Sequence, residues 1–346
     1  MHRYTGRAWH PYIRSLRSPP FARRPVFKSN QRGCLSMLTA IWKNENMKWM
    51  HKTSTWLIAG LVTAMIVGAA LLGKWNGVEE ESQWRADYEQ ALAQYEEGGE
   101  QTAASLTPEL AAEYEYRLQE NIPPIAAYGQ WNYMDEMTLM ISFITLFSII
   151  VTSTLVAGEF QSGSVKLLFI RPVARWKLLL GKYLSGMTFA ALLTMFTLAL
   201  VYITGGLVFG FSPLDAPYLY SSEDLLERSI AVHMLSMFGL GFVQTAVMTL
   251  FAVMIASLFR SNAMAIGLSV FSMFFGTTAT ALLAQLNEPL ASYSLFANND
   301  LTVFISDNVR QLIDVGPWFS ITVLSCYTLL FAVTAFISFT QRDVAI

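Results

Sequence analysis

The sequence predicts an all-α membrane protein with six transmembrane helices, and three observations support this fold class. The chain of 346 residues is 53% hydrophobic and only 14% charged, whereas about a quarter of the residues in soluble domains are charged. Its mean hydropathy is +0.40. Six apolar runs are each long enough to cross a hydrocarbon core that needs about 20 helical residues. They cover residues 55–73, 137–157, 184–209, 230–258, 263–283 and 318–339.

The first 36 residues carry basic side chains, no acidic ones, and the pair Pro19-Pro20. Because such a composition cannot bury an apolar core, it predicts a disordered basic tail over residues 1–36. We favour the simpler interpretation that translation begins at Met37 and that the tail comes from an overlong gene prediction. A transit peptide, which is also basic and acid-free, is the alternative.

Residues 37–54 mix apolar side chains with polar and charged ones and include Trp42 and Trp49. This pattern predicts an amphipathic interfacial helix that lies along the headgroups, with tryptophan as the anchor. A cytoplasmic extension of the first span is the alternative. The six-span domain would then occupy residues 55–346.

The distribution of charge predicts the orientation. With the N-terminus inside, 18 of the 23 Lys and Arg residues fall on the inner side, and 22 of the 25 acidic residues fall outside. Without the basic tail, ten basic residues still lie inside against five outside. Since cytoplasmic segments are enriched in Lys and Arg, we expect both the N- and C-termini in the cytoplasm.

Residues 74–136, between the first and second spans, are the longest predicted loop and contain fourteen acidic side chains. Apolar and aromatic residues recur at helical spacing on both sides of Gly98-Gly99, and Thr107-Pro108 is typical of a helix start. We therefore expect an acidic extracytoplasmic helical hairpin. A solvated charged face is a simpler role for the acids than a binding site for cations.

Residues 158–183, between the second and third spans, are central to the functional prediction. They contain five basic residues and one acid, Glu159. Leu167, Leu168 and Ile170 form an apolar cluster, and Pro172 then biases Arg171 toward an extended or turned conformation. We interpret the segment as a short helix on the cytoplasmic face of the membrane that is available to bind a soluble partner. An ordinary basic cytoplasmic loop is the alternative.

The sequence contains none of the common nucleotide-binding, hydrolase or metal-binding motifs that we searched for. It lacks the GxxxxGK[ST] phosphate loop, because Gly181-Lys182 is followed by Tyr183, and it lacks HExxH and GxSxG. Its two cysteines and four histidines follow no metal-ligand spacing. No enzyme activity, metal or cofactor is therefore expected in this chain.

The spans contain hydroxyl and amide side chains but no Asp, Glu, Lys or Arg near their centres. Each such charge costs roughly 2.5–3.5 kcal/mol on insertion scales and usually marks an ion or proton pathway. An ion-coupled carrier is therefore disfavoured, and the hydroxyls and amides are interpreted as helix-packing contacts. Gly206 and Gly210 form one GxxxG pair, which suits close helix contact.

Several segments resemble the membrane subunits of ATP-driven bacterial exporters, the ABC-2 type permeases. The loop after the second span carries the likeness through GEFQSGSVKLL at 158–168, Arg171-Pro172-Val173, Trp176-Lys177 and Gly181-Lys182-Tyr183. Tyr116-Arg117-Leu118 with Asn121-Ile122-Pro123-Pro124, Leu258–Ser261 and Arg342-Asp343 add to it. The likeness covers residues 37–346 and is strongest over 116–185.

The resemblance implies a permease in the bacterial plasma membrane that moves its substrate by alternating access. Two cytosolic ABC ATPase subunits would bind it together with a second copy or a related permease, and ATP and Mg²⁺ would belong to those ATPases. No nucleic-acid partner is expected. The expected ATPase-coupling residues are Glu159, Phe160, Gly163, Lys166, Arg171, Pro172 and Arg175.

Two matters stay open at this point. A membrane sensor or immunity protein that binds a cationic ligand through the acidic outer hairpin is the alternative function. The substrate of an exporter is also undetermined, since apolar spans with scattered hydroxyls suit lipids, amphipathic peptides or hydrophobic drugs.

Overall fold

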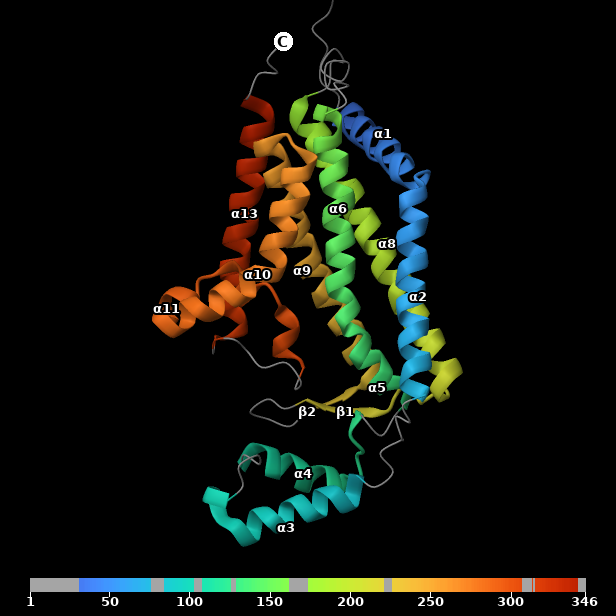
Figure 1. Cartoon of the computed structure of the whole chain (residues 1–346), viewed down its shortest axis with the longest axis vertical. Coiled ribbons are helices and arrows are strands. Elements are labelled where there is room, and N and C mark those ends of the chain that lie inside the picture. Colours follow the sequence, from blue (N-terminus) through green and yellow to red (C-terminus); the bar gives the residue numbers. More distant parts are fainter. Residues whose placement is uncertain are drawn as a thin grey trace, which may run out of the picture.

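The fold is built around six long helices, and a computed structural model gives their positions (Figure 1). It describes residues 31–75, 84–102, 108–125, 129–161, 174–220, 226–306, 313 and 315–341. The predicted tail therefore lies outside the described residues up to residue 30. The helices long and apolar enough to cross a membrane are α2 (Thr53–Trp75), α6 (Met140–Gln161), α8 (Arg175–Phe209), α9 (Ile230–Phe259), α10 (Asn262–Leu286) and α13 (Pro317–Gln341).

For the described residues, the prediction of a mainly helical chain with six helices long and apolar enough to cross a membrane is confirmed. An α-helix satisfies its own backbone hydrogen bonds, which is the condition for crossing lipid. Several hydroxyl groups of the spans are satisfied within their own helix: Thr145, Ser148 and Thr194 each donate a hydrogen bond to the carbonyl four residues earlier. The predicted limits differ most at α8, which begins at Arg175 rather than at residue 184.

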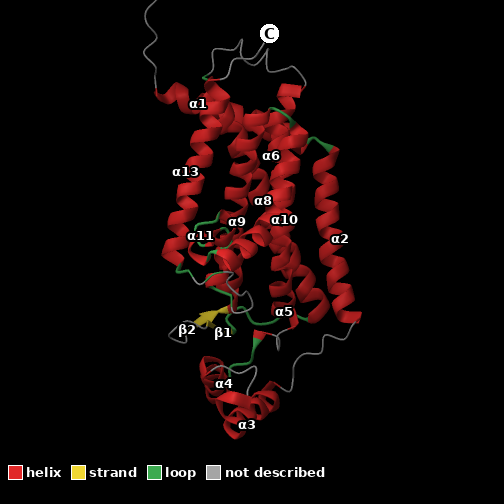
Figure 2. Cartoon of the chain, turned by 60° about the vertical axis from the view of Figure 1, so that its left-hand side comes forward, coloured by secondary structure: helices red, strands yellow, loops and turns green. Residues whose placement is uncertain are grey.

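Helices α6 and α9 form the centre of the bundle, and α8, α10 and α13 pack against them (Figure 2). In both central helices, 56% of the most apolar stretch is buried, against 17% in α2 and α10. Leu71 and Leu72 of α2 and Phe274 and Phe275 of α10 are exposed. Exposed apolar side chains on spanning helices are suited to contact with lipid tails or with another subunit.

Helix α1 (Gln31–Met50) lies at the end of the bundle where the C-terminal end of α13 is found (Figure 1). It begins six residues before the predicted interfacial helix and is separated from α2 by His51 and Lys52. The Thr55 hydroxyl donates to the Trp49 carbonyl oxygen at 2.6 Å across this bend. The first helix is therefore a separate element rather than an extension of α2.

Helices α3 (Trp84–Thr102) and α4 (Pro108–Glu120) pack against each other at the opposite end of the molecule (Figures 1 and 2). Tyr88 of α3 and Tyr114 of α4 stack with their ring centroids 3.9 Å apart. Arg117 and Glu113 of α4 form an ion pair at 2.6 Å. These contacts agree with two helices between the first and second spans.

Short elements complete the end that carries α3 and α4. They are α5 (Gly129–Glu136), η2 (Met137–Leu139), β1 (Pro217–Tyr220), β2 (Leu226–Ser229), α11 (Glu288–Ala291), α12 (Leu295–Asn298) and η3 (Leu301–Phe304). The two strands pair antiparallel, with Pro217 opposite Ser229. The predicted GxxxG contact takes another form, because Gly210 ends α8 at φ 91° and the ring of Phe211 lies against Gly206.

Candidate functional site

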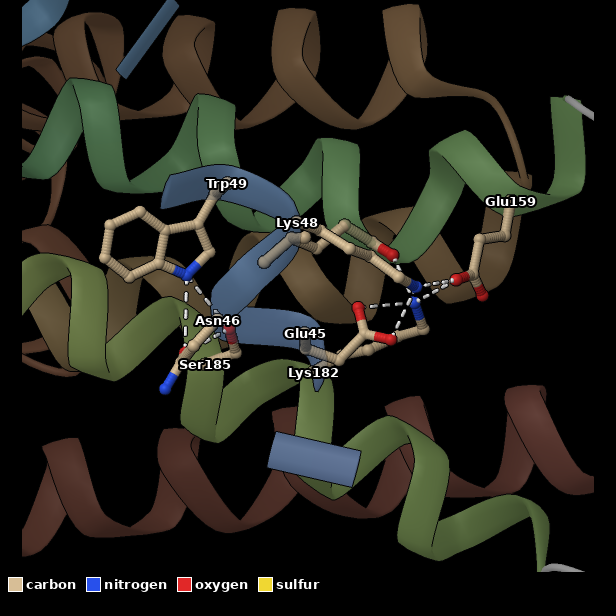
Figure 3. Close-up of polar contacts among 8 residues, drawn as sticks. Glu45, Asn46, Lys48, Trp49, Glu159, Lys182 and Ser185 are labelled. Atoms are coloured by element: carbon tan, nitrogen blue, oxygen red, sulfur yellow. Dashed lines mark hydrogen bonds and ion pairs between the residues drawn. The ribbon is translucent and has the colours of Figure 1, made fainter. Parts of the chain in front are cut away.

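Four charged side chains meet where α1, α6 and α8 come together (Figure 3). This ionic cluster consists of Glu45 and Lys48 of α1, Glu159 of α6 and Lys182 of α8. Lys48 Nζ lies 2.6 Å from Glu45 Oε1 and 2.7 Å from Glu159 Oε1. Lys182 Nζ lies 3.3 Å from Glu45 Oε2 and 2.9 Å from Glu159 Oε1. Each lysine therefore contacts both carboxylates.

The ionic cluster is neutral in sum and largely withdrawn from water. The side chains of Lys182 and Glu45 are 2% and 4% exposed, whereas Lys48 is 38% exposed. Lys182 Nζ also donates to the Leu155 carbonyl oxygen at 2.6 Å. A buried ammonium group is tolerated only when it is paired and hydrogen-bonded, and these contacts supply both conditions.

Lys48, like Glu45, lies on α1 and therefore outside the spanning helices. Burial alone lowers its pKa, but the hydrogen bonds that Lys48 donates to Glu159 and Glu45, together with the charges of these carboxylates, outweigh this effect and hold the pKa above its ordinary value. A lysine whose pKa is raised in the folded protein stabilises the fold fully at pH values below about 10.4, the pKa in the unfolded chain. That stabilisation is lost only as the pH rises through the pKa of the folded protein. Lys48 is therefore charged throughout the neutral range.

Uncharged polar groups continue the contact between α1 and α8 (Figure 3). The Ser185 hydroxyl donates to Asn46 Oδ1 at 2.6 Å, and Trp49 Nε1 donates to the Ser185 hydroxyl oxygen at 3.1 Å. At Gly181, an added Cβ would lie 2.6 Å from Ile41 Cγ2. The small residue at position 181 therefore allows α1 to approach α8 closely.

The predicted coupling residues divide into two groups. Glu159 belongs to the ionic cluster, and Arg175 begins α8 and donates from Nη1 to the Thr340 carbonyl oxygen of α13 at 3.0 Å. Phe160 lies in α6, but its side chain is not among those described. Gly163, Lys166, Arg171 and Pro172 lie outside the described residues. The structure therefore ties both ends of the 158–183 segment to neighbouring helices.

Sequence reasoning did not single out Glu45 or recognise Lys182 as a buried partner. One signal for Glu45 was present, because it is the only acidic residue before Glu79. Lys182 was assigned to the loop, and its burial depends on α8 starting early. Among the described residues, no group of three His, Cys, Asp or Glu side chains is arranged to hold a metal ion. The ionic cluster is a site of contact between three helices.

Comparison with known families assigns the chain. Residues 104–345 match the model of the family described as "Protein of unknown function (DUF2705)", and the chain belongs to that family. It is 29% identical to "Uncharacterized protein YhcI" of Bacillus subtilis (strain 168) over 320 residues, which cover 89% of this chain and 100% of that protein.

A second relative indicates where in the cell this protein is found. The chain is 28% identical to "Uncharacterized membrane protein YdbK" of Bacillus subtilis (strain 168) over 218 residues, which cover 63% of this chain and 83% of that protein. Together with the six apolar helices, this likeness identifies a multi-pass membrane protein.

Proposed function

We propose that the chain is the permease subunit of an ABC exporter of the ABC-2 type. It would move its substrate by alternating access in a bacterial plasma membrane, powered by two cytosolic ATPase subunits that bind the 158–183 segment. A second copy or a related permease would complete the assembly. ATP and Mg²⁺ would be held by the ATPases.

The distribution of charge supports an orientation with the α1 end in the cytoplasm. Basic side chains gather at that end, on α1, at the start of α8 and at the turn after α9: Lys43, Lys48, Lys52, Arg175, Lys177 and Arg260. Helices α3 and α4, at the other end, are rich in Asp and Glu. Basic residues favour the cytoplasmic side of a membrane, so α3 and α4 would form an acidic extracytoplasmic hairpin.

The ionic cluster is the observation that carries the proposal. Glu159 and Lys182 lie at the two ends of the 158–183 segment and are joined directly at 2.9 Å. Glu45 and Lys48 attach both to α1. A force applied to the segment would therefore reach α6, α8 and α1 together, because buried ion pairs resist separation. A slack cytoplasmic loop would need no such anchoring.

The ATPase contact is tested by substitution on the segment. Replacing Arg171 by alanine is expected to reduce recovery of a co-expressed ATPase about tenfold, since one charge-assisted contact is worth roughly that factor. Glu159→Gln is expected to preserve recovery but reduce the stimulation of ATP hydrolysis, because the cluster loses a charge. The measurements are co-purification through a tag on this chain and phosphate release in lipid nanodiscs.

Arg85→Ala on α3 is the matched control for Arg171→Ala and is expected to leave ATPase recovery unchanged. If the intact chain recovers no nucleotide hydrolase, or recovers a kinase in its place, the exporter proposal is wrong. Recovery of a kinase would support the alternative of a membrane sensor.

The orientation is tested by single cysteines in a chain whose own cysteines are replaced by serine. Gln94→Cys on α3 is expected to react with a membrane-impermeant maleimide added to whole cells. Lys52→Cys, at the exposed bend after α1, is expected to react only after the cells are opened. The reverse pattern of labelling would contradict the proposed topology.

A further inference from the structure

A polar cavity enters the bundle between α6, α9, α10 and the segment around α12 and η3. It consists of two hollows of about 380 and 330 Å³, which share Ser142, Gln244 and Asp300 in their walls. Because they share these residues, we treat them as one cavity with two parts. The ionic cluster lies elsewhere, where α1 meets α6 and α8.

The two parts of the cavity differ in character. The first is lined by the carboxylates of Asp135, Glu136 and Asp300, and none of its lining residues is Lys, Arg or His. The second is mixed: Met248, Met273, Phe274 and Phe296 form its apolar side, and hydroxyl, amide and carboxylate groups form the rest, from Ser142, Thr145, Gln244, Thr277, Asn299 and Asp300. A cavity with an acidic part and a part that has one apolar, aromatic side matches a ligand that combines a positive charge with an apolar body.

Asn299 supplies a separate indication of a ligand. It is 6% exposed, lines the second hollow, and its Oδ1 atom has no hydrogen-bond partner among the described residues. A buried acceptor without a partner is unfavourable. A small rotation of the side chain would let this atom accept a hydrogen bond from a ligand N–H in the second hollow.

Asp300 stands next to Asn299 and is held in a fixed position. The backbone N–H and the hydroxyl of Thr302 donate to Asp300 Oδ1 at 3.0 and 2.6 Å. Fixed carboxylates bind cations well because little side-chain entropy is lost on binding. No three acidic or His side chains of the described residues are grouped for a metal ion, so an organic cation suits this site better.

We propose that the cavity binds an amphiphilic amine, with its ammonium group against Asp300 and Asn299 and its apolar body against Phe274 and Phe296. As a binding site, the cavity does not depend on the transport proposal. The further statement that such amines are the exported cargo does rest on the proposed exporter function.

The binding test uses dansylcadaverine, which joins a fluorescent apolar group to a primary ammonium. The purified chain in nanodiscs, without any ATPase, is expected to give a saturable rise in dansyl fluorescence above empty nanodiscs. N-acetylated dansylcadaverine has a similar body but no charge and is expected to bind at least tenfold more weakly. Asp300→Asn keeps the acceptor for Thr302 and is expected to weaken binding about tenfold.

Asp215→Asn, at an exposed position outside the cavity, is the control and is expected to bind as the unmodified chain does. If Asp300→Asn fails to fold, Glu136→Gln serves instead, with an expected loss of about threefold. Equal binding of the acetylated probe, or unchanged binding in the cavity variant, would refute the proposal. Binding that persists when no ATPase is ever recovered would refute only the exporter function.

Discussion

Replacing Lys182 by methionine is expected to lower the free energy of unfolding by about 3 kcal/mol, at the lower end of the range for a buried pair that loses one partner. Methionine fills similar space but leaves Glu45 and Glu159 with a single cation. The loss is not larger because Lys48 continues to contact both carboxylates. The measurement is an SDS titration of the purified protein in mixed micelles.

Lys177→Met is the matched control on the same helix, because Lys177 is only partly buried and belongs to no ion pair among the described residues. It is expected to change stability by less than about 0.5 kcal/mol. The double variant Lys182→Met with Glu45→Gln should lose less free energy of unfolding than the two single variants lose together, since each change removes the partner of the other residue. Strict additivity would mean that the two residues do not interact.

Gly186→Ala is expected to destabilise the bundle by about 1–3 kcal/mol, the usual cost of overpacking a core. An added Cβ at Gly186 would lie 2.1 Å from Thr152 Oγ1 and 2.8 Å from Thr152 Cγ2. Thr152 is buried and β-branched, so its side chain has little freedom to move aside. The same SDS titration measures the change.

Two further variants separate crowding from a general effect of alanine. Gly239→Ala in α9 is expected to be neutral or slightly stabilising, because no atom lies within 4 Å of its added Cβ. Thr152→Ala combined with Gly186→Ala is expected to regain more than half of the lost stability, since it removes both the Oγ1 and Cγ2 atoms. A double variant as unstable as Gly186→Ala would exclude the close contact as the cause.

The six spans could be predicted because hydropathy reports directly on the solvent around a helix. The start of α8 could not be predicted, because residues 175–183 contain three basic side chains, a pattern typical of a cytoplasmic loop. Arg175 is accommodated in the helix because it donates a hydrogen bond to a carbonyl oxygen of α13. Lys182 is accommodated because it forms ion pairs with the two carboxylates of the ionic cluster. Partners that distant in sequence leave no local pattern.

The candidate site was predicted in part. Glu159 was singled out for its place in a basic segment, but its contacts with Lys48 and Lys182 depend on how α1 crosses α8. Ser142 and Gln244 are among the hydroxyl and amide side chains of the spans, which were interpreted from the sequence as packing contacts. Asn299 and Asp300 gave no signal at all, because a cavity is a property of the assembled bundle. The strands β1 and β2 were missed because four residues are too few to reveal alternation.

The turn between α9 and α10 has a mechanical consequence. Helix α9 ends at Phe259 and α10 begins at Asn262, with Arg260 in the left-handed region at φ 53°. A two-residue turn and the packing of α10 against α9 restrict their independent movement, so we expect the two helices to move as one hairpin. The proposed alternating access would therefore need a hinge at another place, and a displacement of the exposed side of α10 would be transmitted directly to α9 at the centre of the bundle.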